Sequence, residues 1–234
     1  MMEIIYNNIN IHTLSPFIYI IYVYLLESNI SRINIKPSKI LYIRKIHNII
    51  LSLLSLFMLI GIIYCNYIQG KFDSLYNLLC LPYDNEKTSM IVNIFLYSKY
   101  LEWGDTLFLC LSRKKVSMLH YTHHMTTVIL VYTNMIDYIN PFLSVFMGLN
   151  CFIHVWMYWY FSFPKGRLYP YRIYITQGQL IQHLICIIAI LYIILLDNCQ
   201  YNIYGIIYGT ILYIMYFVYF SIFYINTYLM VNKE

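Results

Sequence analysis

The sequence has few charged residues. Only 11% of its 234 residues are Asp, Glu, Lys or Arg, and 61% are hydrophobic, whereas a soluble domain carries about 25% charged residues. The deficit runs along the whole length and leaves apolar runs that reach the roughly 20 residues a helix needs to cross a bilayer. These properties exclude a soluble domain. We interpret residues 1–234 as a single polytopic membrane domain.

Apolar runs that are candidate membrane spans occur seven times, which predicts an all-α integral membrane protein with about seven transmembrane helices. Ser15 and Pro16 interrupt the first and shortest run. We therefore expect that run to be retained as a helix and not to be a cleavable signal peptide. The runs are Leu14–Leu26, Ile46–Ile68, Met90–Leu111, Leu119–Ile136, Pro141–Phe163, Ile173–Leu196 and Ile203–Met230.

Basic residues fall in every second connection between these runs. The odd connections contain Arg32, Lys36, Lys39, Arg44 and Lys45, then Arg113, Lys114 and Lys115, then Lys165, Arg167 and Arg172. The even connections contain Lys71 and Lys87 against Asp73, Asp84 and Glu86, then Asp137, then Asp197. Because cytoplasmic loops carry the Lys/Arg excess, we expect the odd connections and the C-terminus in the cytosol, and the N-terminus on the other side. The basic charge is split among short loops, which argues against nucleic-acid binding.

The third run carries three charged residues, Lys99, Glu102 and Asp105. One charge at the centre of a membrane costs about 2.5–3.5 kcal/mol, so the three side chains are expected to face the protein interior. Their spacing of three residues places them on one arc of a helix. They are either a buried ion-pair network that fixes helix packing or the wall of a polar cavity.

The fourth run begins with three histidines, His120, His123 and His124, whose spacing puts them on one helix face. Two uses fit such a cluster. One is metal ligation. The other is nucleophilic or acid–base catalysis, since the imidazole group titrates near neutral pH.

The next two runs also carry polar stripes. Asn150, His154 and Tyr158 recur every four residues, and Thr176, Gln179 and Gln182 every three. Hydrogen bonding between helices alone explains any one such stripe. Four consecutive runs with inward polar stripes favour a polar chamber that the second to seventh helices enclose as a ring.

These residues resemble, in order and spacing, the motifs of the ELO family of very-long-chain fatty-acid elongases. The matching patterns are K-x-x-E-x-x-D-T from Lys99, H-x-x-H-H from His120, N-x-x-x-H-x-x-M-Y-x-Y from Asn150 and T-x-x-Q-x-x-Q from Thr176. The resemblance implies a 3-oxoacyl-CoA synthase of the endoplasmic reticulum membrane. Such an enzyme condenses acyl-CoA with malonyl-CoA and releases CO2 and CoA, with no cofactor and no metal.

The resemblance also implies roles for individual residues. His123 matches the nucleophile that forms an acyl-imidazole, His154 is its partner across the chamber, and His120 and His124 orient it or shuttle protons. Arg113, Lys114 and Lys115 stand where CoA phosphates would arrive. The expected substrate-binding residues within the membrane are Lys99, Glu102, Asp105, Asn150, Tyr158, Thr176, Gln179 and Gln182.

Partners and substrate range follow from the same resemblance. The expected partners are the bilayer and the ketoacyl-CoA reductase, dehydratase and enoyl-CoA reductase of the elongation cycle, and a homodimer is left open. The neighbourhood of the histidine box favours saturated or monounsaturated acyl chains.

Two other functions fit part of the same pattern. Di-iron lipid desaturases and hydroxylases resemble this chain in membrane character, but they use about eight histidines in three boxes. This sequence has seven histidines in all and one H-x-x-H-H box. A non-enzymatic seven-span receptor or transporter explains the number of runs and the polar stripes, but not the clustered imidazoles.

Two of the six cysteines, Cys80 and Cys199, lie in even connections and therefore on the expected lumenal side. The endoplasmic-reticulum lumen permits disulfides, whereas the cytosol keeps thiols reduced. The sequence predicts a Cys80–Cys199 disulfide that closes a chain loop of about 120 residues, which stabilises by a few kcal/mol in the chain-entropy account. The alternative is two free thiols.

Overall fold

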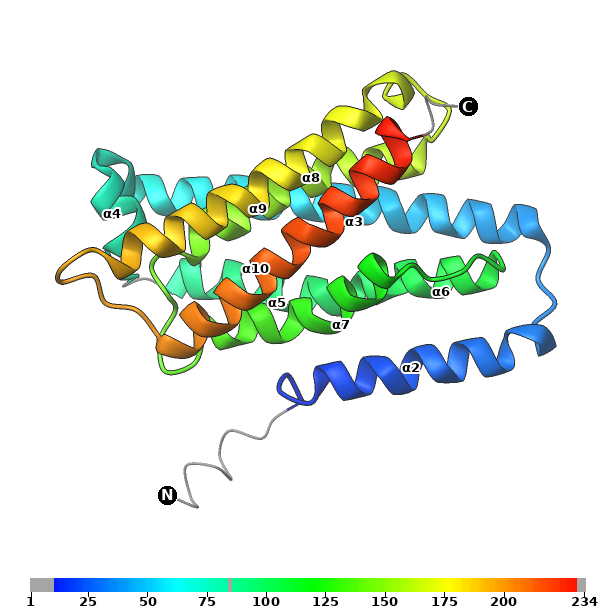
Figure 1. The fold of residues 1–234 in the computed structure, drawn as a ribbon, viewed down its shortest axis with the longest axis horizontal. Helices are drawn as coiled ribbons and strands as arrows, with labels where there is room; N and C mark the ends of the chain where they lie inside the picture. Colours follow the sequence, from blue (N-terminus) through cyan, green and yellow to red (C-terminus); the bar gives the residue numbers. More distant parts are fainter. Residues whose placement is uncertain (1–10, 84–85, 231–234) are drawn as a thin grey trace, which may run out of the picture.

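The computed structural model of the chain describes residues 11–83 and 86–230. Across these residues the regular secondary structure is helical, with no strand, which confirms the predicted all-α class. The long helices run roughly side by side along the longest axis of the molecule (Figure 1). Both chain termini and Asp84 lie outside the described residues.

The longer helices correspond to the apolar runs of the sequence. Proline at the start of α2 and α3 fixes the backbone in a helical conformation where no N–H partner is needed. The side chains of Ser117 and Asn202 cap α7 and α10 by accepting backbone N–H bonds. The helices are α2 (Ser15–Asn29), α3 (Pro37–Ile68), α4 (Leu75–Cys80), α5 (Glu86–Leu101), α6 (Trp103–Leu111), α7 (Met118–Thr133), α8 (Leu143–Ser162), α9 (Arg172–Ile194) and α10 (Ile203–Tyr224).

Short helical turns complete the described secondary structure. They are the 3₁₀ turns η1 (Ile30–Arg32), η2 (Lys71–Asp73) and η3 (Tyr169–Tyr171) and the π-helical turn η4 (Ile225–Leu229).

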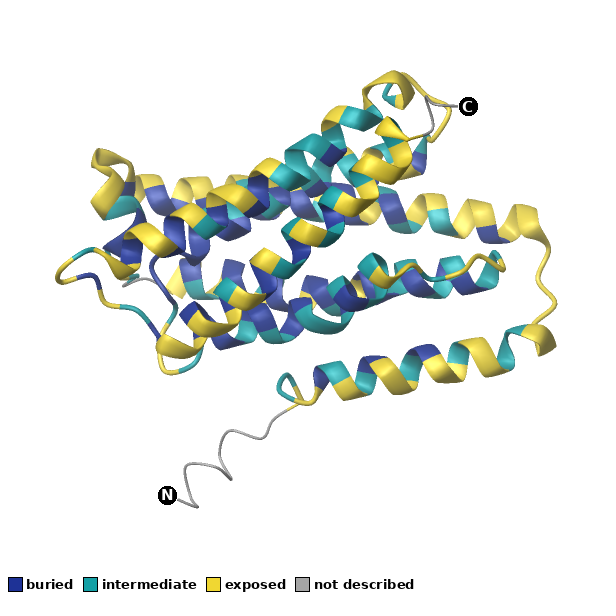
Figure 2. Cartoon of the chain, viewed as in Figure 1, coloured by how far each residue is buried: buried dark blue, intermediate teal, exposed yellow. Residues whose placement is uncertain are grey.

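Three helical segments are long and apolar enough to cross a membrane: Pro37–Ile68, Tyr169–Ile194 and Ile203–Leu229. The protein is therefore a multi-pass membrane protein. Large hydrophobic side chains such as Leu53, Ile188 and Ile211 are exposed on the outer surface of these helices, while the buried residues line the inside of the bundle (Figure 2).

The structure differs from the predicted helices in two places. The second run was expected to start at Ile46, but α3 starts at Pro37, so Lys39, Arg44 and Lys45 lie on a helix and not in a loop. Lysine and arginine are good helix formers, and Pro37 gives the helix its first turn. The third run was expected to be one helix, but it divides into α5 and α6 at Glu102. There the backbone tightens into a 3₁₀-type bond from the Asp105 N–H to the Glu102 carbonyl.

The packing of the long helices surrounds a common interior. α3 packs against α8 and α5, α8 against α9, α9 against α10, α10 against α7, and α7 against α5. α2 lies outside this group and packs against α6 and α7. The polar stripes on α5 to α9 are therefore within reach of one another.

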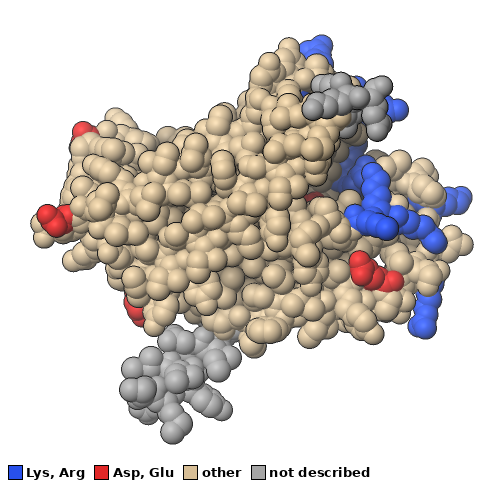
Figure 3. Space-filling model, in the orientation of Figure 1, with Lys and Arg blue, Asp and Glu red and all other residues tan. Residues whose placement is uncertain are grey.

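Charge is distributed unevenly between the two ends of the bundle. Lysine and arginine gather at the end where α3 begins and where α6 connects to α7 (Figure 3). We call this the basic end. The acidic residues visible on the same face lie mostly toward the opposite end, where α4 and the α9–α10 connection lie. This segregation is the arrangement that the alternating loop charges predicted.

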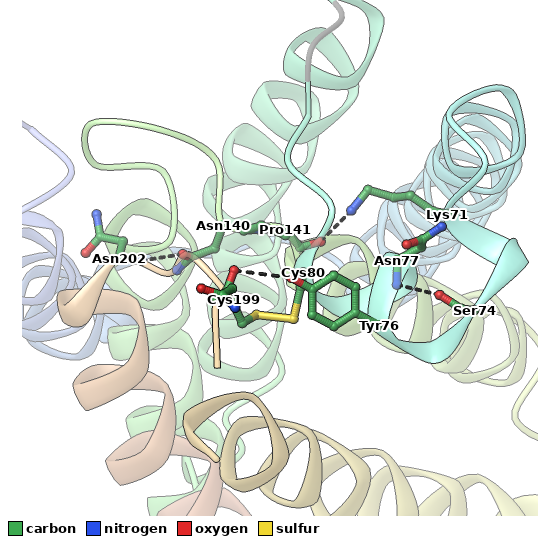
Figure 4. The surroundings of a disulfide bond; sticks show 10 residues. Lys71, Ser74, Tyr76, Asn77, Cys80, Asn140, Pro141, Cys199 and Asn202 are labelled. Carbon is green, nitrogen blue, oxygen red and sulfur yellow. Dashed lines mark hydrogen bonds between the residues drawn. A yellow bond between two sulfur atoms is a disulfide. The ribbon is translucent and has the colours of Figure 1, made fainter. Parts of the chain in front are cut away.

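A disulfide joins Cys80 of α4 to Cys199 of the α9–α10 connection, with Cα atoms 5.1 Å apart (Figure 4). This is the pairing expected from the sequence, and we call its side of the bundle the disulfide end. Nearby, the backbone N–H of Asn202 donates to Oδ1 of Asn140 over 2.7 Å. These contacts tie three connections together at the disulfide end.

Lys71 adds a buried cation to the disulfide end, although its sequence position suggested only a loop charge. Its Nζ donates to the carbonyl oxygen of Pro141 over 3.1 Å and lies 4.0 Å from the ring centre of Tyr83. Burial lowers the pKa of Lys71 to about 8.

Non-reducing peptide mapping is expected to recover Cys80 and Cys199 in one cross-linked peptide. The other cysteines, Cys65, Cys110, Cys151 and Cys186, are buried free thiols and should react with alkylating reagent only after unfolding. Cys80→Ser and Cys199→Ser should each lower stability by about 2–4 kcal/mol, and the double variant should be no worse than either. Recovery of both residues as free thiols from protein kept oxidised would contradict this pairing.

Candidate active site

A buried ionic network joins α5 and α8 in the middle of the bundle. Lys99 Nζ lies 2.8 Å from Oε1 of Glu102 and 2.8 Å from Oδ1 of Asn150. Nδ1 of His154 lies 3.3 Å from the same Glu102 oxygen, and Nε2 lies 3.2 Å from Nδ2 of Asn150. The amide of Asn150 donates, so Nε2 accepts and the ring proton of neutral His154 sits on Nδ1, facing Glu102. The charged stripe therefore forms a buried ion-pair network around Glu102, and of its three residues Lys99 alone also lines the cavity described below.

A second polar layer surrounds Asp105 nearer the basic end. The Tyr158 hydroxyl donates to Oδ2 of Asp105 over 2.8 Å. Nε2 of His47, on α3, lies 3.2 Å from Oδ1 without the alignment of a hydrogen bond. His47 was not predicted as a site residue. In the sequence, the one indication of a role for His47 is that two polar residues, His47 and Asn48, stand together near the start of a long apolar run.

The histidine box divides between two environments. His120 Nε2 lies 2.9 Å from Oγ1 of Thr106, which also bonds to the Tyr19 hydroxyl over 2.7 Å. The His120 and His124 rings lie 4.2 Å apart between their centres. His123 turns instead toward α10, and its ring centre lies 5.1 Å from that of Tyr216. Histidines on one face of α7 therefore contact two different groups: His120 contacts Thr106 of α6, and His123 contacts Tyr216 of α10.

A small cavity of about 30 Å³ lies at the centre of the bundle. Side chains of α5, α7, α8, α9 and α10 line it, and among them are apolar ones such as Phe95, Leu130 and Met147. The volume holds only a few water molecules. The main polar residues that line it are Lys99, His123, Asn150, Gln182 and His183.

Several predicted residues lie away from this cavity. Gln179 Nε2 contacts the sulfur of Met157 at 3.4 Å, and Thr176 Oγ1 lies 3.5 Å from the Tyr228 hydroxyl. Arg113, Lys114 and Lys115 are exposed in the α6–α7 connection at the basic end. The structure therefore brings His123, Lys99, Asn150 and Gln182 together and leaves the other predicted residues around them. Within the described ranges, no three His, Cys, Asp or Glu side chains are grouped to hold a metal ion.

Comparison with known proteins places this arrangement in a family. The sequence profile described as ELO: GNS1/SUR4 family matches residues 4–234. The chain belongs to this family. The resemblance stated from the four motifs is thereby confirmed, and one residue of each motif, Lys99, His123, Asn150 and Gln182, lines the cavity of this ELO chain.

Relatives of the chain are named as fatty acid elongases. The ELO chain is 32% identical over 181 residues to fatty acid elongase A of Dictyostelium discoideum, which covers 77% of this chain and 66% of that protein. It is 33% identical over 149 residues to fatty acid elongase sre1 of the same organism, covering 59% and 53%. It is 32% identical over 155 residues to very long chain fatty acid elongase 5 of Homo sapiens, covering 61% and 50%. The matches span about half to two thirds of these relatives' lengths. No solved structure matches the chain significantly.

Gly104 of the ELO chain explains how His47 reaches Asp105. A Cβ atom at position 104 would lie 2.6 Å from Cε1 of His47 and 3.1 Å from its Nε2. We expect Gly104→Ala to displace His47 and to lower the unfolding free energy by about 1–3 kcal/mol. In a His47→Ala background the clash is gone, so the same change should be neutral or stabilising, because alanine favours helix.

A double-mutant cycle on thermal unfolding of the purified protein in detergent measures this coupling. Equal losses from Gly104→Ala in both backgrounds would show that the His47 contact is not what requires glycine at this position.

Proposed function

We propose that the chain is the condensing enzyme of fatty-acid elongation, converting acyl-CoA and malonyl-CoA into a 3-oxoacyl-CoA two carbons longer, with release of CO2 and CoA. Family membership supports a role in fatty-acid elongation. The observation that carries the proposed chemistry is the position of His123, which lines the same cavity as Lys99, Asn150 and Gln182. No cofactor or metal takes part in the proposed reaction.

The proposed reaction has two halves. First, a ring nitrogen of His123 attacks the thioester carbonyl, a C–N bond forms, the C–S bond breaks, and CoA leaves with the electron pair and a proton. Then malonyl-CoA loses CO2, and the resulting carbanion attacks the acyl carbon while the C–N bond breaks; the departing nitrogen of His123 takes up one proton from water, which restores the neutral ring. An acyl-imidazole is about as activated as a thioester, so it suits the intermediate position.

Neighbouring side chains have positioning or binding roles in this scheme. Glu102 and Asn150 hold the His154 ring from both of its nitrogens, and Asn150 and Gln182 are the amides placed to meet the enolate. His120 and His124 flank His123 on the same face of α7, with the ring centres of His123 and His124 5.3 Å apart and Trp103 Nε1 bonded to the carbonyl of His124 over 3.1 Å. Asp105, Tyr158, Thr176 and Gln179 would meet the substrate on the way in from the basic end.

The proposed orientation places the basic end in the cytosol. There Arg113, Lys114 and Lys115 are exposed and would meet the phosphates of CoA. The disulfide end is then lumenal, where an oxidising compartment maintains the Cys80–Cys199 bond. α3, α5 with α6, and α7 to α10 would form the ring of spans around the chamber, in the endoplasmic reticulum membrane, and α2 would be a seventh span beside them.

Terminal tags in sealed microsomes test this orientation. We expect protease to remove a C-terminal tag and to spare an N-terminal one, because the basic connections would be cytosolic. A protected C-terminal tag would contradict the seven-span arrangement.

Membranes from an expressing host test the function itself. Supplied with labelled malonyl-CoA and a panel of acyl-CoAs, they should release CO2 and form 3-oxoacyl-CoA, with saturated and monounsaturated chains preferred and with no loss of activity on adding a chelator. The ketoacyl-CoA reductase, dehydratase and enoyl-CoA reductase of the cycle would consume this product. If no malonyl-dependent product forms under conditions where a known elongase works, the proposal is refuted in favour of a receptor or transporter. Oxidation of the acyl chain that a chelator inhibits would favour a di-iron enzyme.

A further inference from the structure

His183 is a buried imidazole that neither the motifs nor the proposed mechanism uses. It follows Gln182 on α9, and its side chain is 3% exposed. It lines the central cavity together with His123. Its Nδ1 is buried and has no hydrogen-bond partner in the protein. A polar atom left without a partner in a bundle interior requires an explanation.

Aromatic rings of α10 surround His183. The ring centres of Tyr213, Tyr216 and Phe220 lie 6.0, 5.6 and 5.2 Å from that of His183. Tyr216 packs against both imidazoles, since its ring centre also lies 5.1 Å from that of His123. Its hydroxyl is already bonded to Oγ1 of Thr126 over 2.6 Å. Tyr216 therefore contacts both histidine rings while its hydroxyl is bonded elsewhere.

A packing role alone does not explain a histidine here. Phenylalanine fills a similar volume among aromatic rings and carries no polar atom, whereas an unpaired imidazole nitrogen in the interior costs about 1–3 kcal/mol. In the described part of the chain His183 forms no ion pair. A neutral imidazole ring has one N–H donor. A neutral imidazole in an apolar site can polarise a carbonyl group without giving up its proton.

We propose that His183 is a further catalytic residue that donates a hydrogen bond to the carbonyl oxygen of the acyl group during its transfer to and from His123. The proposal rests on the proposed elongase function. When the nitrogen of His123 bonds to the carbonyl carbon, the π electrons of C=O move to oxygen, and the His183 N–H stabilises that negative charge. When the carbonyl re-forms, the C–S bond breaks and CoA leaves, while His183 keeps its proton throughout.

Substitution of His183 by Phe and by Gln separates a donor from a packing residue. His183→Phe keeps a ring among the aromatic neighbours and removes the N–H, so kcat should fall by roughly 10²–10³-fold, as for the loss of one oxyanion donor. KM for acyl-CoA should stay within about threefold, because the interaction forms mainly in the transition state. His183→Gln keeps an N–H donor and should recover at least about tenfold over His183→Phe.

The assay is malonyl-dependent elongation in membranes, with each variant's thermal unfolding and expression measured in parallel. Leu184→Phe is the matched control, since it puts the same ring on the neighbouring, outward-facing position and should leave kcat unchanged. If His183→Phe does not fold, His183→Leu replaces it. The pH dependence of kcat should keep its shape in the variants, because His183 does not exchange a proton.

Three results would overturn the role of His183: a folded Phe or Leu variant with kcat within threefold of wild type, a Gln variant no better than the Phe variant, or the loss of one limb of the pH profile. These results differ from a failure of the elongase function. If the wild type itself makes no malonyl-dependent product, the proposed function fails and the proposal for His183 fails with it. If the wild type is active and the folded variants keep that activity, the catalytic role of His183 alone is refuted.

Discussion

His123→Ala is expected to abolish condensation while leaving the protein folded and inserted. His123 is the residue of the histidine box whose side chain lines the central cavity. Loss of a nucleophile lowers turnover by on the order of 10³-fold or more. The measurement is elongation of a fatty acyl-CoA with labelled malonyl-CoA in membranes with matched expression. Release of CoA from acyl-CoA without malonyl-CoA should disappear as well, because the first half-reaction needs His123.

Control variants separate the role of His123 from damage to α7. Met118→Ala lies on the same helix at an exposed position and should retain full activity. Activity of His123→Ala within twofold of wild type would remove His123 from the nucleophile role. His154, which is hydrogen-bonded to Asn150 of the cavity lining, would then be the next candidate.

The all-α class and most of the long helices were predictable from the sequence, for a simple reason. Long apolar runs and alternating loop charge are local properties that a membrane imposes on a chain. The start of α3 was missed because charged residues were read as loop, although Lys39 and Arg44 continue a helix readily. The break at Glu102 was missed because one tightened turn leaves the apolar pattern unchanged.

The site was predictable where residues share a helix and less so where they meet across helices. Spacing placed Asn150 and His154 on one face, and they bond to each other. Spacing also put His120 with His123, yet the first faces Thr106 and the second the cavity, because the neighbours of a helix face are set by tertiary packing. His47 and His183 were missed for the same reason: neither belongs to a periodic polar pattern, and only packing shows what each one faces.

Glu102→Leu is expected to lower the unfolding free energy by about 3–5 kcal/mol, because it leaves the Lys99 ammonium buried without its carboxylate. Glu102 and Lys99 are both 2% exposed, and their charged atoms lie 2.8 Å apart. The same carboxylate also holds Nδ1 of His154, so the single variant should lose activity together with stability. Thermal unfolding in detergent and the yield of folded protein give the measurement.

The double variant Lys99→Met with Glu102→Leu distinguishes a buried pair that fixes packing from one that serves the reaction. Removing both charges leaves no unpaired ion, so most of the lost stability should return. Activity should stay low, because Asn150 and His154 have lost the charged groups that orient them. Glu27→Leu, at an exposed position on α2, is the matched control and should change neither quantity. A Glu102→Leu variant that unfolds at the wild-type temperature would show that Lys99 is not held as a charged group by Glu102, and recovery of activity in the double variant would assign the pair to packing alone.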